Sequence, residues 1–124
     1  MGLHISFPQL NEQGEPILDQ WGYEVDRLDA PNIYITHNLV RMASYGKKPV
    51  YQALWRPEQL NFTKASQLAG AIRDYLAEFE KYPNQYRKFD PPNGWGSYDS
   101  FHQALKKLLE FCEQNPDAKY SVSV

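Results

Sequence analysis

Hydrophobic and polar residues alternate near both ends of the chain and recur at helical spacing between them. Residues 3–7 alternate with a period of two, which predicts an opening strand. Residues 20–26 alternate in the same way after a polar turn at 11–16, and they predict a second strand paired antiparallel with the first. A short extended piece is expected at 33–35. The alternation returns at 120–124 and predicts a terminal strand beside this pair.

Two long segments carry apolar residues at helical spacing. Residues 63–82 have the pattern of an amphipathic helix of about five turns that ends before Pro83. Residues 97–114 begin with a serine that can cap a helix and end before Pro116. Shorter helical segments are expected at 36–46, 50–55, 57–60 and 84–89.

The order of strands, helices and strand predicts the α+β fold class. We expect a small antiparallel sheet, made by N-terminal strands and the C-terminal strand. Its one face packs against the two long amphipathic helices and the short helices. No internal repeat and no linker is evident in the sequence, so residues 1–124 are expected to form a single domain.

Charge and hydropathy exclude several functional classes. The chain has 13 basic and 15 acidic residues, which we interpret as mixed along its whole length, and this argues against nucleic acid as a partner. The N-terminus has no basic leader before an apolar stretch, and no run approaches the roughly 20 apolar residues that cross a bilayer. We therefore expect a cytoplasmic protein without a membrane partner.

Cysteine and histidine are too sparse for a metal centre. The single cysteine, Cys112, falls on an apolar helical stripe and fits a reducing compartment. His4 and His102 have no partner at metal-ligand spacing. Neither a metal nor another cofactor is therefore expected.

A first candidate segment, Thr36-His37-Asn38, lies where a predicted extended piece leads into a helix. Free amides and the helix dipole at such a junction favour anions, and His37 can act there as acid, base or hydrogen-bond donor. The alternative is that Thr36 only caps the helix and the other two residues fill its first turn. No serine or cysteine nucleophile is identifiable beside His37.

A second candidate is the pair Trp55 and Arg56. The indole can stack on a planar ligand, while the guanidinium can bind a phosphate or a carboxylate. The alternative is that Trp55 anchors a short helix in the core and Arg56 pairs with a neighbouring acid.

The third candidate is the loop from Asn93 to Ser97, in which two glycines flank Trp95 just before a helix. The backbone can approach a ligand closely there, while the ring packs or stacks. The loop lacks the pattern of a phosphate-binding loop. The alternative is that Trp95 fills the core between the two long helices.

Four short segments, taken together, resemble a family of small uncharacterised proteins of bacterial, phage and prophage genomes. They are Thr-His-Asn-Leu at 36–39, Leu-Trp-Arg-Pro-Glu at 54–58, Asn-Gly-Trp-Gly-Ser-Tyr at 93–98 and Pro-Asp-Ala at 116–118. The resemblance covers about residues 32–122 and implies a stand-alone cytoplasmic domain. It implies no particular activity, cofactor or catalytic residue.

We expect a non-enzymatic binding module for a small anionic or aromatic ligand or for a protein partner, and the resemblance adds a phage or prophage accessory role. The residues expected to bind are Thr36, His37, Asn38, Trp55, Arg56, Asn93 and Trp95. The alternative is a small hydrolase or transferase with His37 as general base and Asn38 or Arg56 stabilising negative charge. A homo-oligomer formed through exposed aromatic residues is a third hypothesis.

Overall fold

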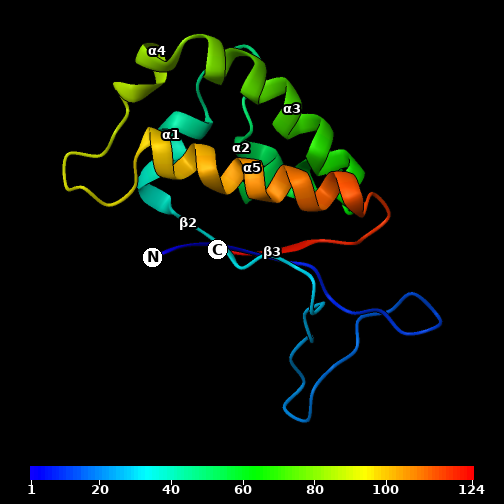
Figure 1. Cartoon of the computed structure of the whole chain (residues 1–124). Helices are drawn as coiled ribbons and strands as arrows, with labels where there is room; N and C mark the ends of the chain where they lie inside the picture. Colours follow the sequence, from blue (N-terminus) through cyan, green and yellow to red (C-terminus); the bar gives the residue numbers. More distant parts are fainter.

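The computed structural model describes residues 1–124 and confirms the α+β class, with the helices on one side of a small sheet (Figure 1). The elements are β1 (Gly2–Ser6), β2 (Ile33–Thr36), the 3₁₀ helix η1 (His37–Leu39), α1 (Val40–Ala43), α2 (Tyr51–Trp55), the 3₁₀ helix η2 (Pro57–Leu60), α3 (Ala65–Lys81), α4 (Pro83–Arg87), α5 (Tyr98–Gln114) and β3 (Ser121–Ser123).

The sheet is antiparallel and has the strand order β2-β1-β3, which confirms the predicted C-terminal strand. Ile5 lies opposite both Ile33 of β2 and Val122 of β3, and these apolar residues face the helices. His4 and Tyr34 face the other way, with their ring centroids 4.8 Å apart. Helices thus cover a single face of the sheet, as the apolar alternation predicts.

The partner of β1 differs from the prediction. Residues 20–26 form no strand, and β1 pairs instead with Ile33–Thr36, the expected short extended piece. The reason is local: the Asp19 carboxylate accepts hydrogen bonds from the backbone N–H groups of Trp21 and Tyr23, at 2.9 and 3.0 Å. Donors that the side chain occupies are lost to a strand ladder. Trp21 and Tyr23 are consequently 73% and 71% exposed.

Residues 10–25 contain two copies of one eight-residue loop, so the expectation of no internal repeat is wrong. The side-chain oxygen of Asn11 accepts hydrogen bonds from the backbone N–H groups of Gln13 and Glu15, at 2.9 and 3.0 Å. Eight residues later, the Asp19 carboxylate accepts the two equivalent hydrogen bonds. Gly14 and Gly22 take the same place in the two copies, with φ of 78° and 84°. A side-chain cap followed by a left-handed glycine closes each loop.

The two loops are joined to each other by a closed ring of three backbone hydrogen bonds. The Ile17 N–H donates to the Gln9 carbonyl at 2.8 Å, and the Val25 N–H donates to the Ile17 carbonyl at 2.9 Å. The Gln9 N–H donates to the Val25 carbonyl at 2.7 Å and closes the ring. We call residues 8–32, which connect β1 to β2, the arm. Figure 1 shows most of the arm extending below the sheet. Its end near β2 lies against α5, where the Arg27 guanidinium lies over the Phe111 ring and donates to the Asn115 side chain at 2.9 Å.

The long helices form where their patterns place them. Gln67 reaches back to accept the N–H groups of Thr63 and Lys64 at 2.8 and 3.0 Å, while Ser97 caps α5 by accepting the N–H of Ser100 at 3.1 Å. Their apolar stripes meet in a core of 28 buried hydrophobic residues, and no polar or charged residue is buried. Cys112 lies in this core, as predicted.

Stability is expected to fall in alkaline solution. Burial raises the pKa of the Cys112 thiol to about 12 and that of Tyr86 to about 12. In the unfolded chain these groups ionise near pH 8.5 and 10, so the unfolded chain loses protons while the folded protein keeps them. The free energy of unfolding therefore decreases as the pH rises from about 9 toward 12. Urea unfolding at pH 7, 9 and 10.5 measures this; equal stability at all three would contradict it.

Candidate functional site

The first candidate segment closes the end of β2. Thr36 has an extended backbone and its hydroxyl accepts the Asn38 N–H at 3.4 Å, so it caps η1 as the capping interpretation predicts. His37 and Asn38 fill the first turn; His37 is half-buried and Asn38 is exposed. The cap directs the side chains of residues 37 and 38 to different neighbours, which the following contacts identify.

His37 is held by Trp55. The Trp55 indole N–H donates to Nδ1 of His37 at 3.0 Å, and Trp55 is only 4% exposed. It also stacks on Tyr51, with ring centroids 5.6 Å apart. Since an indole nitrogen only donates, Nδ1 must be the acceptor and the neutral imidazole carries its hydrogen on Nε2. Trp55 is therefore a buried support for His37, as the core interpretation predicts, and is shielded from any ligand.

Replacing Trp55 by phenylalanine is expected to lower the free energy of unfolding by about 1–3 kcal/mol, because a half-buried imidazole acceptor loses its donor. Urea unfolding measures this. Tyr51→Phe is the matched control, since it keeps the ring that stacks on Trp55. Equal stability of Trp55→Phe and the Tyr51→Phe control would show that the indole N–H contributes nothing to holding His37.

The loop from Asn93 to Ser97 presents Trp95 to solvent. The Asn93 side chain accepts the backbone N–H of Trp95 at 2.9 Å, and Gly94 and Gly96 have φ of 75° and 97°. These conformations favour glycine and turn the indole outward. Trp95 is 71% exposed, so the interpretation that it fills the core between the long helices is wrong.

The first and third candidate segments meet. The Asn38 side-chain amide donates to the Trp95 carbonyl at 3.4 Å, although the two residues are 57 positions apart. Gly96 lies directly against Thr36 and Leu39: a Cβ added at Gly96 would be 2.7 Å from Thr36 Cγ2. The structure thus brings Thr36, Asn38 and Trp95 to one surface, and we call this surface the Trp95 face.

Arg56 does not join this surface through any polar contact. It follows α2 and is exposed, and none of the five ion pairs of the protein includes it. The expectation that Arg56 pairs with a neighbouring acid is therefore wrong. Of the seven predicted residues, the Trp95 face contains Thr36, Asn38 and Trp95. Asn93 holds the loop that carries Trp95, and His37 contacts Trp55 instead.

The surroundings of the Trp95 face are shallow and partly charged. A depression of about 150 Å³ lies beside Thr36 between β2 and α5, lined mainly by apolar side chains, among them Leu39 and Phe101. At the start of α5, Asp99 accepts hydrogen bonds from Arg87 at 3.0 and 3.4 Å. These bonds raise the pKa of the Arg87 guanidinium. The Trp95 face therefore combines the exposed indole of Trp95 and the side-chain amide of Asn38 with a small apolar recess.

The arm has a concentration of negative charge that the sequence interpretation did not predict. Six of the 15 acidic residues lie in residues 8–32 and only one basic residue, Arg27, does, so the arm has a net charge of −5 and the rest of the chain +3. The charges are thus not mixed along the chain. The detectable signal was the eight-residue spacing of Leu-Asn-x-x-Gly at 10–14 and Leu-Asp-x-x-Gly at 18–22. Asx residues and glycine at such spacing indicate loops rather than a strand.

Comparison with known proteins adds no relative. Searches against protein-family models, curated proteins and solved structures each found no match. No helix combines the length and the hydrophobicity needed to cross a membrane. No three His, Cys, Asp or Glu side chains gather at a place where they could hold a metal ion.

Proposed function

We propose that the protein is a non-enzymatic binding module whose Trp95 face receives a protein partner. The observation that carries this proposal is the exposure of Trp95 on a loop that hydrogen bonds fix at both Asn93 and Asn38. A loop whose backbone is already fixed loses less conformational entropy when a partner covers it. Tryptophan is also among the residues that most often carry the binding energy of protein interfaces.

The shape of the surface favours a protein over a small ligand. Small-molecule sites are clefts of about 300–1,000 Å³ that enclose most of the ligand. The depression beside Thr36 measures about 150 Å³, which is too small for that purpose. A protein partner needs only a shallow recess next to an anchor, with polar groups at the rim. The exposed side-chain amide of Asn38 supplies such a group.

The geometry gives the alternative of a hydrolase or transferase less support. A general base needs a free lone pair within hydrogen-bond reach of its substrate. Nδ1 of His37 already accepts the Trp55 N–H, and in this tautomer Nε2 carries the hydrogen. His37 could accept a proton only after breaking the hydrogen bond from Trp55 or after moving its hydrogen from Nε2 to Nδ1. Arg56 is exposed and forms no ion pair that would direct it toward His37.

We also propose that the protein is located in the cytoplasm of bacteria that carry a phage or prophage. The resemblance of four segments to proteins of bacterial, phage and prophage genomes supports a cytoplasmic accessory protein of a phage or prophage. The buried Cys112 thiol is consistent with a reducing compartment. Fractionation of producing cells tests the location, and recovery of the chain in the membrane or exported fraction would contradict it.

Capture from extract of producing cells tests the function, with immobilised wild-type protein and Trp95→Ala side by side. We expect at least one protein that the wild type retains and Trp95→Ala loses by about tenfold or more, as for a central anchor residue. Trp21→Ala is the matched control, because Trp21 is a tryptophan of nearly equal exposure, 73%, on the arm.

Two outcomes would overturn the proposal. One is that Trp95→Ala and Trp21→Ala retain the same proteins as the wild type. The other comes from thermal-shift screening with nucleotides: a rise in melting temperature that Trp95→Ala abolishes would identify a small ligand instead of a protein.

A further inference from the structure

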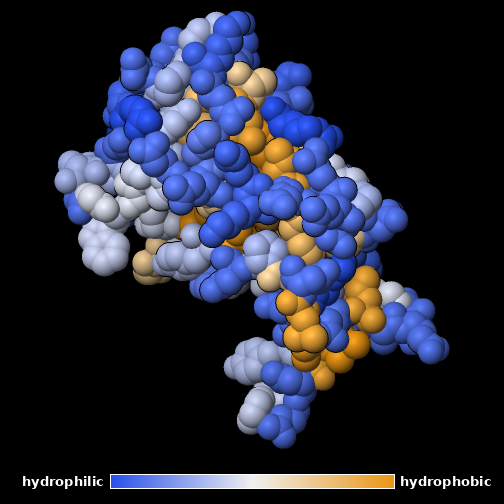
Figure 2. Space-filling model, viewed as in Figure 1, coloured by the Kyte–Doolittle hydropathy of each residue, from blue (hydrophilic) through white to orange (hydrophobic).

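The arm exposes apolar side chains that the fold itself leaves uncovered. The members of this set are Ile17, Leu18, Trp21, Tyr23 and Leu28. Leu28 is 98% exposed, and the two aromatic rings are nearly three-quarters exposed. Figure 2 shows hydrophobic colour gathered on the segment that hangs below the helices. An apolar group of this size on a hydrogen-bonded arm marks an interaction site.

We infer that this site binds a second copy of the same chain, with the arm of each copy lying along α5 of the other. Charge is the first argument. The arm has a net charge of −5 and the remaining residues +3, so the arm is complementary to the body of its own sequence. Opposite charge on two contacting surfaces favours their encounter and fixes the orientation.

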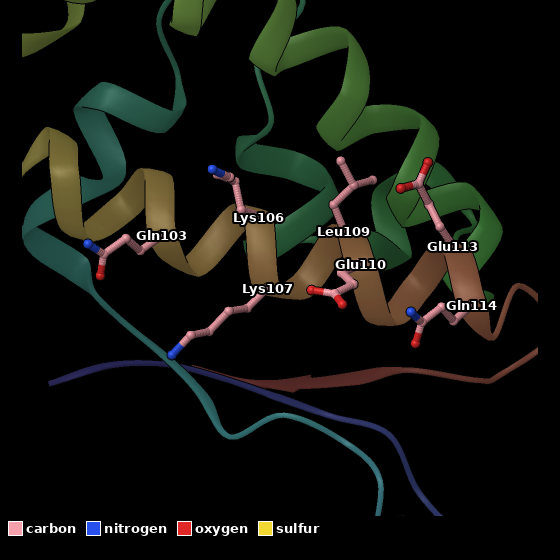
Figure 3. Close-up of a pocket in the computed structure, with 7 residues that line it drawn as sticks. All are labelled: Gln103, Lys106, Lys107, Leu109, Glu110, Glu113 and Gln114. Atoms are coloured by element: carbon pink, nitrogen blue, oxygen red, sulfur yellow. The ribbon is translucent and has the colours of Figure 1, made fainter.

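The receiving surface is a shallow trough of about 590 Å³ on the exposed side of α5. Figure 3 shows its lining residues, which extend along the helix from Gln103 to Gln114. A second hollow, of about 230 Å³, shares Lys107, Glu110 and Gln114 with it and includes Asp29 and Pro31 of the arm. The trough therefore continues to the root of the arm.

The lining of the trough includes two lysines and two glutamates, and its unpaired side chains have a net charge of +1. Lys106 and Lys107 are exposed and take part in no ion pair, whereas Glu113 is paired with Arg73 at 3.1 Å. Glu110 is the remaining free carboxylate. Lysine stems also cover apolar surface while their ammonium groups stay hydrated. Beside Leu109 they offer aliphatic contact to the arm together with positive charge.

The area available is adequate for a stable pair. A standard interface takes about 800 Å² from each partner, and each covered aromatic side chain contributes about 150–250 Å². In a two-fold arrangement each partner contributes one arm, with two such rings and three exposed aliphatic side chains, together with one trough. In a two-fold dimer every contact is made twice, and each arm is covered by the other copy. The assembly is therefore closed and does not grow into a filament.

Sedimentation velocity of the full chain at two concentrations tests this inference. We expect a dimer that Trp21→Ala with Tyr23→Ala weakens by about tenfold or more in dissociation constant. Trp95→Ala is the matched control and leaves the dimer intact, so failure of this inference is separate from failure of the proposed function. A wild type that stays monomeric at about 100 μM, or a dimer that the arm variant does not weaken, would overturn it.

A charge exchange tests the docking site. Glu12→Lys with Glu15→Lys and Glu24→Lys changes the net charge of the arm from −5 to +1 and places a basic arm against the lysines of the trough. Lys106→Glu with Lys107→Glu places the acidic arm against an acidic trough. Each variant alone is expected to be monomeric, whereas an equimolar mixture dimerises, because both of its arm–trough contacts join opposite charges. A mixture that remains monomeric, or two variants that each dimerise alone, would overturn the α5 trough as the receiving surface.

Discussion

Replacing Phe79 by alanine is expected to lower the free energy of unfolding by about 3–5 kcal/mol. Phe79 is fully buried on α3 and stacks on Tyr98 of α5, with ring centroids 4.1 Å apart. Tyr75, Tyr86 and Phe101 surround it, at centroid distances of 5.2, 5.1 and 5.9 Å. Since small domains are stable by about 5–15 kcal/mol, a loss of this size removes a large share of the total.

The size of this effect depends on the cavity that the substitution leaves. The rings around Phe79 are fixed by further contacts: the Tyr98 hydroxyl donates to the Phe79 carbonyl at 2.6 Å, and the Tyr75 hydroxyl to the Met42 carbonyl at 2.6 Å. They cannot close on the vacated space without losing these bonds, so the cavity persists.

Urea unfolding followed by circular dichroism measures the change. Phe79→Leu is the matched control, expected to cost less than Phe79→Ala because it keeps most of the apolar volume. A loss below about 1 kcal/mol for Phe79→Ala would contradict a core organised around this ring.

Replacing Gly96 by alanine is expected to destabilise the protein and to separate the two segments of the Trp95 face. A left-handed backbone costs alanine about 1–2 kcal/mol, and φ at Gly96 is 97°. The added Cβ would also be 2.7 Å from Thr36 Cγ2 and 3.2 Å from Leu39 Cγ. Forcing a methyl group into packed surroundings costs about another 1–3 kcal/mol. The loop must move away from Thr36, which breaks the Asn38–Trp95 hydrogen bond.

Gly94→Ala separates the cost of the left-handed backbone from the cost of the steric contact with Thr36 and Leu39. Gly94 has a similarly left-handed φ of 75°, but a Cβ there would meet nothing within 4 Å. It is therefore expected to cost only the backbone part, about 1–2 kcal/mol. Urea unfolding gives the difference, and amide chemical shifts of Asn38 and Trp95 report whether the segments part. Equal losses for the two variants would mean that the contact of Gly96 with Thr36 does not hold the face together.

Much of the fold could be predicted from local sequence. The apolar stripes of α3 and α5, the Ser97 cap and the alternation in β1 depend on residues a few positions apart, and the structure confirms each of them. The alternation at 20–26 misled because the same pattern arises in a loop. The Asp19 carboxylate favours the loop because it accepts the backbone N–H groups that a strand ladder would need. Gly22, with φ of 84°, allows the chain to turn there.

The contacts within the Trp95 face could not be predicted from the sequence. The sequence marks Thr36, Asn38 and Trp95 as unusual but carries no sign that residues 57 positions apart meet, nor whether an indole between glycines points inward or outward. Trp55 and Arg56 are adjacent in sequence but do not form one site, because Trp55 is buried in the core while Arg56 is exposed and unpaired. Adjacent residues in a short helix face different directions, so their proximity in sequence says little about a shared site.

The sequence by itself determined the α+β class, the two long helices and the apolar residues that join them, because hydrophobic periodicity and capping act within a few residues. Only the tertiary structure decided which segment pairs with β1, that Trp55 is covered and Trp95 exposed, and that Asn38 meets Trp95. Those outcomes depend on packing between distant segments, whose free energy is shared among many contacts and leaves no local pattern.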